Sequence, residues 1–97
     1  MSELYNRSEK IDEMKTLIDK SIKLCGSQEA LARRLKIKQQ DIQQMKSGKR
    51  KISPATIGLL CNVLDIGREE SRRLAVTAIV LNAKGHMQRE LSKAFAV

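Results

Sequence analysis

Apolar residues recur at intervals of three and four along most of this chain, which is the repeat of helices that bury one face. In the first third of the sequence they fall at Ile11, Met14, Leu17, Ile18 and Ile22. Signals for strands are weak, because the chain has no Asn-Gly or Asp-Gly turn and its one β-branched cluster lies between helix-forming runs. The spacing predicts an all-α fold, a bundle of five helices or of six.

Turn-forming residues mark the ends of the first two helices. Gly26 follows the apolar run of residues 9–24 and can adopt the left-handed conformation that ends a helix. Ser27 is a typical N-cap residue and predicts a second helix over residues 28–35. Only a short turn then separates this helix from the next one.

The third helix, expected over residues 38–46, has few apolar positions. Ile42 and Met45 are expected in the core, and Gly48 is expected to cap the C-terminus. This helix therefore buries little of its surface and displays amide side chains instead.

Two further helical segments complete the chain. Ser53 is expected to cap a fourth helix, with Pro54 at the first position, where the missing N–H costs nothing. The last segment reads as one long helix, or as two helices over 68–84 and 86–96 if Gly85 interrupts it.

Positive charge is concentrated in one quarter of the chain. The 97 residues carry a net charge of +8, and residues 31–54 hold eight of the basic residues against Asp41 alone. Such a balance points to a polyanionic partner, with nucleic acid or an anionic membrane surface first. On charge alone, a merely solvated face is an equally good interpretation.

Several classes of protein find no support in the sequence. No stretch is long and apolar enough to span a membrane, and the N-terminus lacks a signal-peptide core, so we expect a cytoplasmic protein without a membrane partner. Cys25 and Cys61 have no second ligand nearby, so we expect two buried thiols and neither a metal nor another cofactor. The single histidine, His86, is expected on the surface, and the carboxylates are scattered along the helices. We therefore expect that the protein is not an enzyme and has no small-molecule substrate.

The third helix has the composition that reading DNA requires. Asn and Gln amides can pair with the edge of adenine in the major groove, and flanking cations can contact phosphates. Four amides on this helix are the expected base contacts: Gln39, Gln40, Gln43 and Gln44.

At this level of detail the chain resembles a known family. Residues 28–35 and 36–50 resemble the helix-turn-helix of Cro and cI-type, lambda-repressor-like phage repressors, because their apolar residues fall in the family's register. These positions are Leu31, Leu35, Ile37, Ile42 and Met45. The resemblance extends over about residues 9–66.

The resemblance implies roles for particular residues. In lambdoid repressors the glutamines that open the two motif helices cooperate over a base and a phosphate, and Gln28 and Gln39 occupy those positions. The implied phosphate contacts are Ser27, Gln28, Lys38, Lys46, Ser47, Lys49, Arg50 and Lys51. The chain departs from the family at Lys36, where a glycine is common, so we expect strain of roughly 1 kcal/mol there or a shifted turn.

The C-terminal segment is expected to form a dimer. Residues 1–66 are predicted to be the DNA-binding domain, and residues 67–97 a helical extension that packs on it. Seven of the eight residues 74–81 are apolar, which is more than a small core is expected to bury. The alternative is that this run wraps its own core. The expected interface comprises Leu74, Ala78, Leu81, Met87, Leu91 and Phe95.

These features predict a transcriptional regulator that binds double-stranded DNA. We expect a phage or prophage repressor that occupies a palindromic operator as a homodimer. Two alternatives use the same fold: an adaptor that docks on a phage or host protein, and the antitoxin of a toxin–antitoxin pair.

Overall fold

The computed structural model describes residues 7–95, and these form six α-helices and no strand. The helices are α1 (Arg7–Cys25), α2 (Gln28–Leu35), α3 (Gln39–Ser47), α4 (Pro54–Val63), α5 (Arg68–Asn82) and α6 (Gly85–Phe95). The all-α prediction is confirmed, in its six-helix form. Of the described helices, none is both long and apolar enough to cross a membrane.

The predicted helix ends are present at the expected residues. The side chains of Ser27 and Ser53 each accept a hydrogen bond from the backbone N–H three residues on, at 3.0 and 3.1 Å. Gly26 and Gly48 have positive φ angles of 100° and 86°, so they close α1 and α3 in the left-handed conformation. The end of α1, the start of α2, the end of α3 and the start of α4 are therefore set by local sequence.

The C-terminal segment is broken into two helices, although not where Gly85 was expected to act. Helix α5 ends at Asn82, and Ala83 takes an extended conformation at the C-cap. The side-chain amide of Gln88 in α6 donates to the carbonyls of Val80 and Ala83, at 3.1 and 3.5 Å. A side chain from the next helix thus satisfies carbonyls at the end of α5, and the break comes two residues before the expected one.

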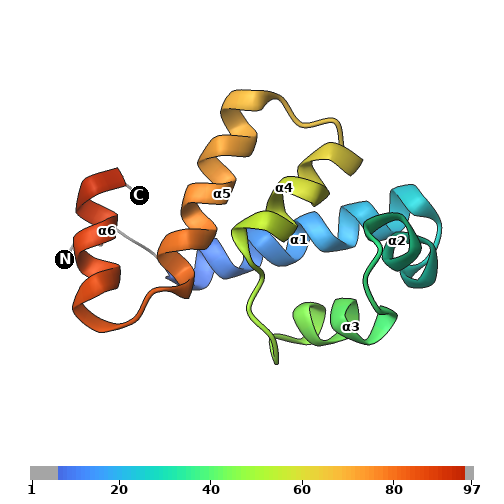
Figure 1. The fold of residues 1–97 in the computed structure, drawn as a ribbon, viewed down its shortest axis with the longest axis horizontal. Coiled ribbons are helices and arrows are strands. Elements are labelled where there is room, and N and C mark those ends of the chain that lie inside the picture. The colour runs from blue at the N-terminus through green and yellow to red at the C-terminus, as the bar shows by residue number, and fades with distance from the viewer. Residues whose placement is uncertain (1–6, 96–97) are drawn as a thin grey trace.

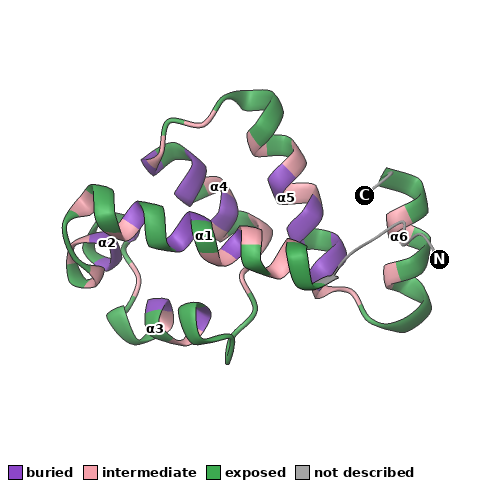
Figure 2. Cartoon of the chain, turned by 180° about the vertical axis from the view of Figure 1, so that it is seen from behind, coloured by how far each residue is buried: buried purple, intermediate pink, exposed green. Residues whose placement is uncertain are grey.

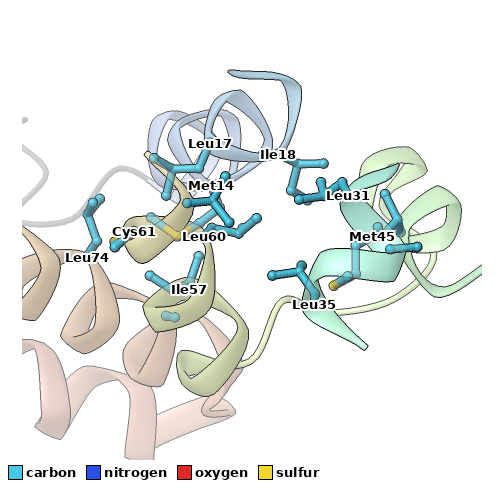
Figure 3. Packing of buried hydrophobic residues seen from close by; sticks show 14 of the residues in the cluster. Met14, Leu17, Ile18, Leu31, Leu35, Met45, Ile57, Leu60, Cys61 and Leu74 are labelled. Carbon is cyan, nitrogen blue, oxygen red and sulfur yellow. The ribbon is translucent and has the colours of Figure 1, made fainter. Parts of the chain in front are cut away.

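Helix α1 runs through the middle of the bundle and contacts α2, α3, α4 and α5 (Figure 1). Figure 3 shows Met14 and Leu17 of α1 close to Leu60 of α4, and Leu31 of α2 beside Met45 of α3. Ile42 and Met45 of α3 are both buried, as expected. One apolar cluster therefore holds the first five helices together.

The structure corrects the expected dimer interface at three of its six residues. Leu74, Ala78 and Leu81 are only 2%, 0% and 7% exposed, because α5 packs them against α1 and α4. They have no surface to offer to a second chain while this core is intact. The apolar run is buried mostly within its own chain, and its one exposed member is Ile79, at 39%.

Helix α6 differs from the other five helices in having no buried residue (Figure 2). It packs against α5 and stands at the end of the molecule opposite α2 (Figure 1). Met87 and Phe95 are 52% and 46% exposed, and Leu91 is half-buried. These three predicted interface residues therefore lie on a helix that its own chain leaves largely uncovered.

Lys36 adopts the left-handed conformation that the resemblance led us to expect, with φ 59° and ψ 42°. A residue with a side chain costs roughly 1–2 kcal/mol when its backbone is in the left-handed region. Glycine removes this cost, but it also makes the unfolded chain more flexible, which offsets part of the gain. We expect Lys36→Gly to raise the free energy of unfolding by up to about 1 kcal/mol, measured by chemical denaturation. Lys20, an exposed lysine inside α1, is the matched control. Lys20→Gly is expected to lower the free energy of unfolding by about 1 kcal/mol, because glycine is unfavourable inside a helix, and equal effects of the two changes would contradict this account.

An ion-pair cluster joins α5 to α1. The Arg73 guanidinium donates to Glu70 at 2.6 and 2.9 Å and to Glu13 of α1 at 2.6 Å. The hydrogen bond from Arg73 lowers the pKa of Glu70 below its ordinary value of 4.5. The same bonds, first from Glu70 and then from Glu13, raise the pKa of Arg73.

This cluster predicts a loss of stability in acid. The pKa of Glu70 is lower in the folded state than its ordinary value of 4.5. The ionised carboxylate therefore adds to the stability of the fold at pH values above 4.5, and this added stability is lost as pH falls through the folded-state pKa. We expect the thermal midpoint of the wild type to fall more between about pH 6 and pH 3 than that of Glu70→Gln. Glu69→Gln, an exposed neighbour, is the control and should keep the wild-type pH dependence. Identical pH profiles for wild type and Glu70→Gln would contradict the prediction.

Candidate nucleic-acid interface

The motif helices α2 and α3 contact each other across a tight turn at residues 36–38. The backbone N–H of Ile37 donates to the carbonyl of Ala32 at 3.0 Å, which closes α2. Ile37 packs against the core cluster, so the turn is anchored by an apolar side chain. These contacts fix α3 as a separate helix at the edge of the molecule, on the opposite side of α1 from α5 (Figure 1).

Helix α3 buries two side chains and presents amides on the rest of its surface. Gln39, Gln40 and Gln43 are exposed, whereas Gln44 is half-buried. Three of the four expected base contacts therefore lie on an accessible surface, and Gln44 is partly covered.

The glutamine that opens α2 reaches α3, but at a different residue from the one implied by the resemblance. The Gln28 amide nitrogen donates to the Gln43 side-chain oxygen at 2.9 Å. Gln43 lies one turn beyond Gln39, and the described hydrogen bonds do not join Gln28 to Gln39. The pair Gln28–Gln43 connects the start of α2 to the exposed face of α3.

Most of the expected phosphate contacts are accessible. Helix α3 and its flanks expose Lys38, Lys46, Ser47, Lys49 and Lys51. Ser27 is exposed as well, and its hydroxyl oxygen is already used to cap α2. A row of cations thus borders the exposed amides of α3.

Arg50 is the expected phosphate contact that the structure places in an ion pair. Its guanidinium donates to Asp41 of α3 at 2.8 Å, while its side chain remains 55% exposed. The backbone N–H groups of Lys49 and Arg50 also donate to the carbonyl of Gln44, at 2.9 and 3.2 Å. Arg50 therefore ties the loop after α3 to α3 itself.

Two residues near the site were not foreseen from the sequence. In the sequence, Asp41 stands out only as the one negative charge in a basic segment, and nothing in its nine-residue separation from Arg50 indicates a pair. Lys15 belongs to α1, yet its Nζ lies 3.3 Å from the position that a Cβ on Gly48 would take. Only the packing of α1 against α3 brings Lys15 to the loop, so local sequence carried no signal for it.

The described residues offer no obvious metal centre. Within residues 7–95, no group of three His, Cys, Asp or Glu side chains is placed to hold a metal ion. Cys61 is buried and Cys25 only partly so, which corrects the expectation that both thiols are buried. His86 is exposed, as expected.

Comparison with known families gives one result. Residues 18–70 match the family described as bacterial toxin YdaS, a small helical, helix-turn-helix-like family. The match runs from the second half of α1 to the first turn of α5, so it includes every predicted base and phosphate contact. No curated protein and no solved structure matched the chain. Because the match covers more than half of the 97 residues, the chain belongs to the bacterial toxin YdaS family.

Proposed function

We propose that this protein is a sequence-specific DNA-binding regulator that acts as a repressor of the Cro and cI type. The observation that carries the proposal is α3, which exposes Gln39, Gln40 and Gln43 beside the row of cations on its flanks. An α-helix fits the major groove, and glutamine amides can make paired hydrogen bonds to adenine there. The exposed face of α3 would therefore contact the bases, while the cations on its flanks would contact the DNA backbone.

The borders of α3 supply the contacts to phosphate. Lys46 and Lys49 extend from the end of α3, and the N-terminus of α2 presents backbone N–H groups at Ser27 and Gln28. A helix N-terminus favours an anion because its N–H groups and its dipole both point toward it. Such contacts orient the protein on the duplex without reading its sequence.

A symmetric dimer would place two copies of α3 on one operator. Repressors of this class read half-sites about one helical turn apart, and a two-fold dimer provides that spacing. The face of α6 that carries the exposed Met87 and Phe95 and the half-buried Leu91 is the surface that supports this part of the proposal.

Glutamine and lysine substitutions test the proposal by different signatures. Gln39→Ala and Gln40→Ala are each expected to cost about 1–3 kcal/mol of discrimination at particular base pairs, since bidentate amide contacts are lost. Lys49→Ala is expected to weaken binding to all sequences alike. A preferred operator is first selected from random DNA duplexes. Binding titrations are then carried out on this operator and on a panel of variants that each change one base pair. A uniform loss on every sequence from both glutamine changes would contradict direct readout.

The family's description favours a second candidate, a toxin that arrests growth. Controlled expression in bacteria distinguishes the two, with Gln39→Ala as the informative variant. Growth arrest that persists in the Gln39→Ala variant would mean that the toxic activity does not depend on sequence-specific DNA binding. Arrest that disappears with it, or no arrest, would favour the regulator.

A further inference from the structure

A pocket of about 190 Å³ opens behind the loop that follows α3. It lies between α1, this loop and the end of α5, so it touches three segments that are distant in sequence. Its apolar wall is formed by Ile11, Met14, Met45, Ile52 and Leu81. Met14, Met45 and Leu81 are buried residues of the core, so the wall is a continuation of that core.

The polar residues that line the pocket are cationic or neutral. They are Lys15, Arg50, Lys51 and Asn82, and no carboxylate is among the described lining residues. Arg50 is paired with Asp41, but Lys15 makes no ion pair within the described part of the chain. Among residues 7–95, Lys51 makes one long hydrogen bond, of 3.5 Å, from Nζ to the Asn82 carbonyl. Two ammonium groups are therefore available to an anion over an apolar wall.

We propose that this pocket binds a small amphiphilic organic anion, with an apolar body on the wall and a carboxylate between Lys15 and Lys51. A cavity of roughly 150 Å³ holds benzene in a protein core, so the volume here suits a single ring or a short chain. A free phosphate or a DNA phosphate would satisfy the lysines but leave the apolar wall uncovered. The apolar wall therefore favours a ligand with an apolar organic group, and the two lysines favour a ligand that is negatively charged.

Such a ligand would oppose DNA binding, a consequence that rests on the proposed function. Lys51 and the loop at residues 48–52 are expected to face the DNA backbone, and a bound carboxylate neutralises part of that charge. Such coupling between two binding sites is reciprocal, so bound DNA must lower the affinity for the ligand by the same factor. The pocket would then serve as an inducer site directly behind the recognition helix.

Ligand binding can be tested without DNA by nuclear magnetic resonance of the full chain. Benzoate is the probe, and it should produce saturable shifts centred on Gly48, Ile52 and Asn82. Benzamide, which has the same shape without the charge, should bind about tenfold more weakly, because a charge-assisted hydrogen bond is lost. Acetate and inorganic phosphate, which lack the apolar body, should give no saturable shifts at these residues. Phosphate shifts equal to those of benzoate would overturn the organic anion in favour of a phosphate site.

Matched lysine variants locate the carboxylate. Lys15→Gln and Lys51→Gln should each weaken benzoate about fivefold or more without changing benzamide, and the same spectra report whether each variant is folded. Lys20→Gln removes an exposed lysine of α1 that does not line the pocket, and it should bind benzoate as the wild type does. Equal affinities of all three variants for benzoate would overturn the proposal.

The regulatory consequence has its own measurement. Benzoate should lower affinity for operator DNA, whereas an equal concentration of acetate should not. Saturable benzoate binding without this effect would overturn the antagonism alone, and DNA binding without any benzoate site would overturn the pocket proposal while leaving the proposed function intact.

Discussion

Raising the salt concentration from 50 to 200 mM is expected to lower the affinity of the proposed dimer for operator DNA roughly 10³-fold or more. Each phosphate contact releases condensed counterions, so the logarithm of affinity falls linearly with that of salt concentration. Each subunit exposes Lys38, Lys46, Lys49 and Lys51 along α3 and its flanks, and Arg50 is partly neutralised by Asp41. Two subunits thus offer about eight contacts, in the range for which a loss of this size is expected.

The slope of this salt dependence identifies the residues responsible. Lys49→Ala is expected to reduce the slope by about 1 for each subunit in contact with DNA. Lys20→Ala removes an exposed lysine of α1 outside this row and should leave the slope unchanged. Binding that is insensitive to salt, or equal slopes for both variants, would contradict a phosphate-contacting role for the row.

Truncating Ile42 is expected to be the most damaging single change in α3. Its side chain is 1% exposed, and with Met45 it is one of the two buried residues that hold α3 to the rest of the bundle. Ile42→Ala should lower the free energy of unfolding by about 2–5 kcal/mol, because apolar contacts are lost and a cavity remains. That is a large share of the roughly 5–15 kcal/mol that stabilises a domain of ordinary size.

Chemical denaturation measures this effect, with Gln40→Ala as the control in the same helix. Gln40 is exposed, so its removal should change the free energy of unfolding by no more than about 0.5 kcal/mol. A small effect of Ile42→Ala would mean that α3 is held by contacts other than its two apolar side chains.

Local signals in the sequence were sufficient to predict most of the fold. The caps at Ser27 and Ser53, the glycines at 26 and 48, and the left-handed Lys36 act within a few residues of the chain. The four cap residues were predicted from chemistry that does not depend on tertiary structure, whereas the left-handed conformation at Lys36 was expected from the resemblance, and all five are confirmed.

The apolar run at residues 74–81 shows where such reasoning fails. Its composition correctly predicted that it must be buried, but composition does not tell whether the covering surface belongs to the same chain. Packing against α1 and α4 buries Leu74, Ala78 and Leu81 within one chain. The apolar surface left uncovered lies instead on α6, after a break at which the Gln88 side chain donates to the Val80 carbonyl.

The candidate site was predictable in its residue types but not in its contacts. The amides and cations of residues 38–51 could be predicted because they are contiguous in sequence. The pairs Gln28–Gln43 and Asp41–Arg50, and the approach of Lys15 to Gly48, join residues that only the packing of α1, α2 and α3 brings together. The pocket behind the loop has the same origin.

A competition gel shift tests the central claim most directly. The purified protein is bound to the DNA that precedes its own coding sequence, and random DNA of equal length is added as competitor. We predict that the complex persists at about ten- to hundred-fold excess of competitor, because specific sites are bound far more tightly than random ones. Loss of the complex at an equal amount of competitor would contradict sequence-specific binding and leave a basic helical domain, for which a partner of α6 would become the question.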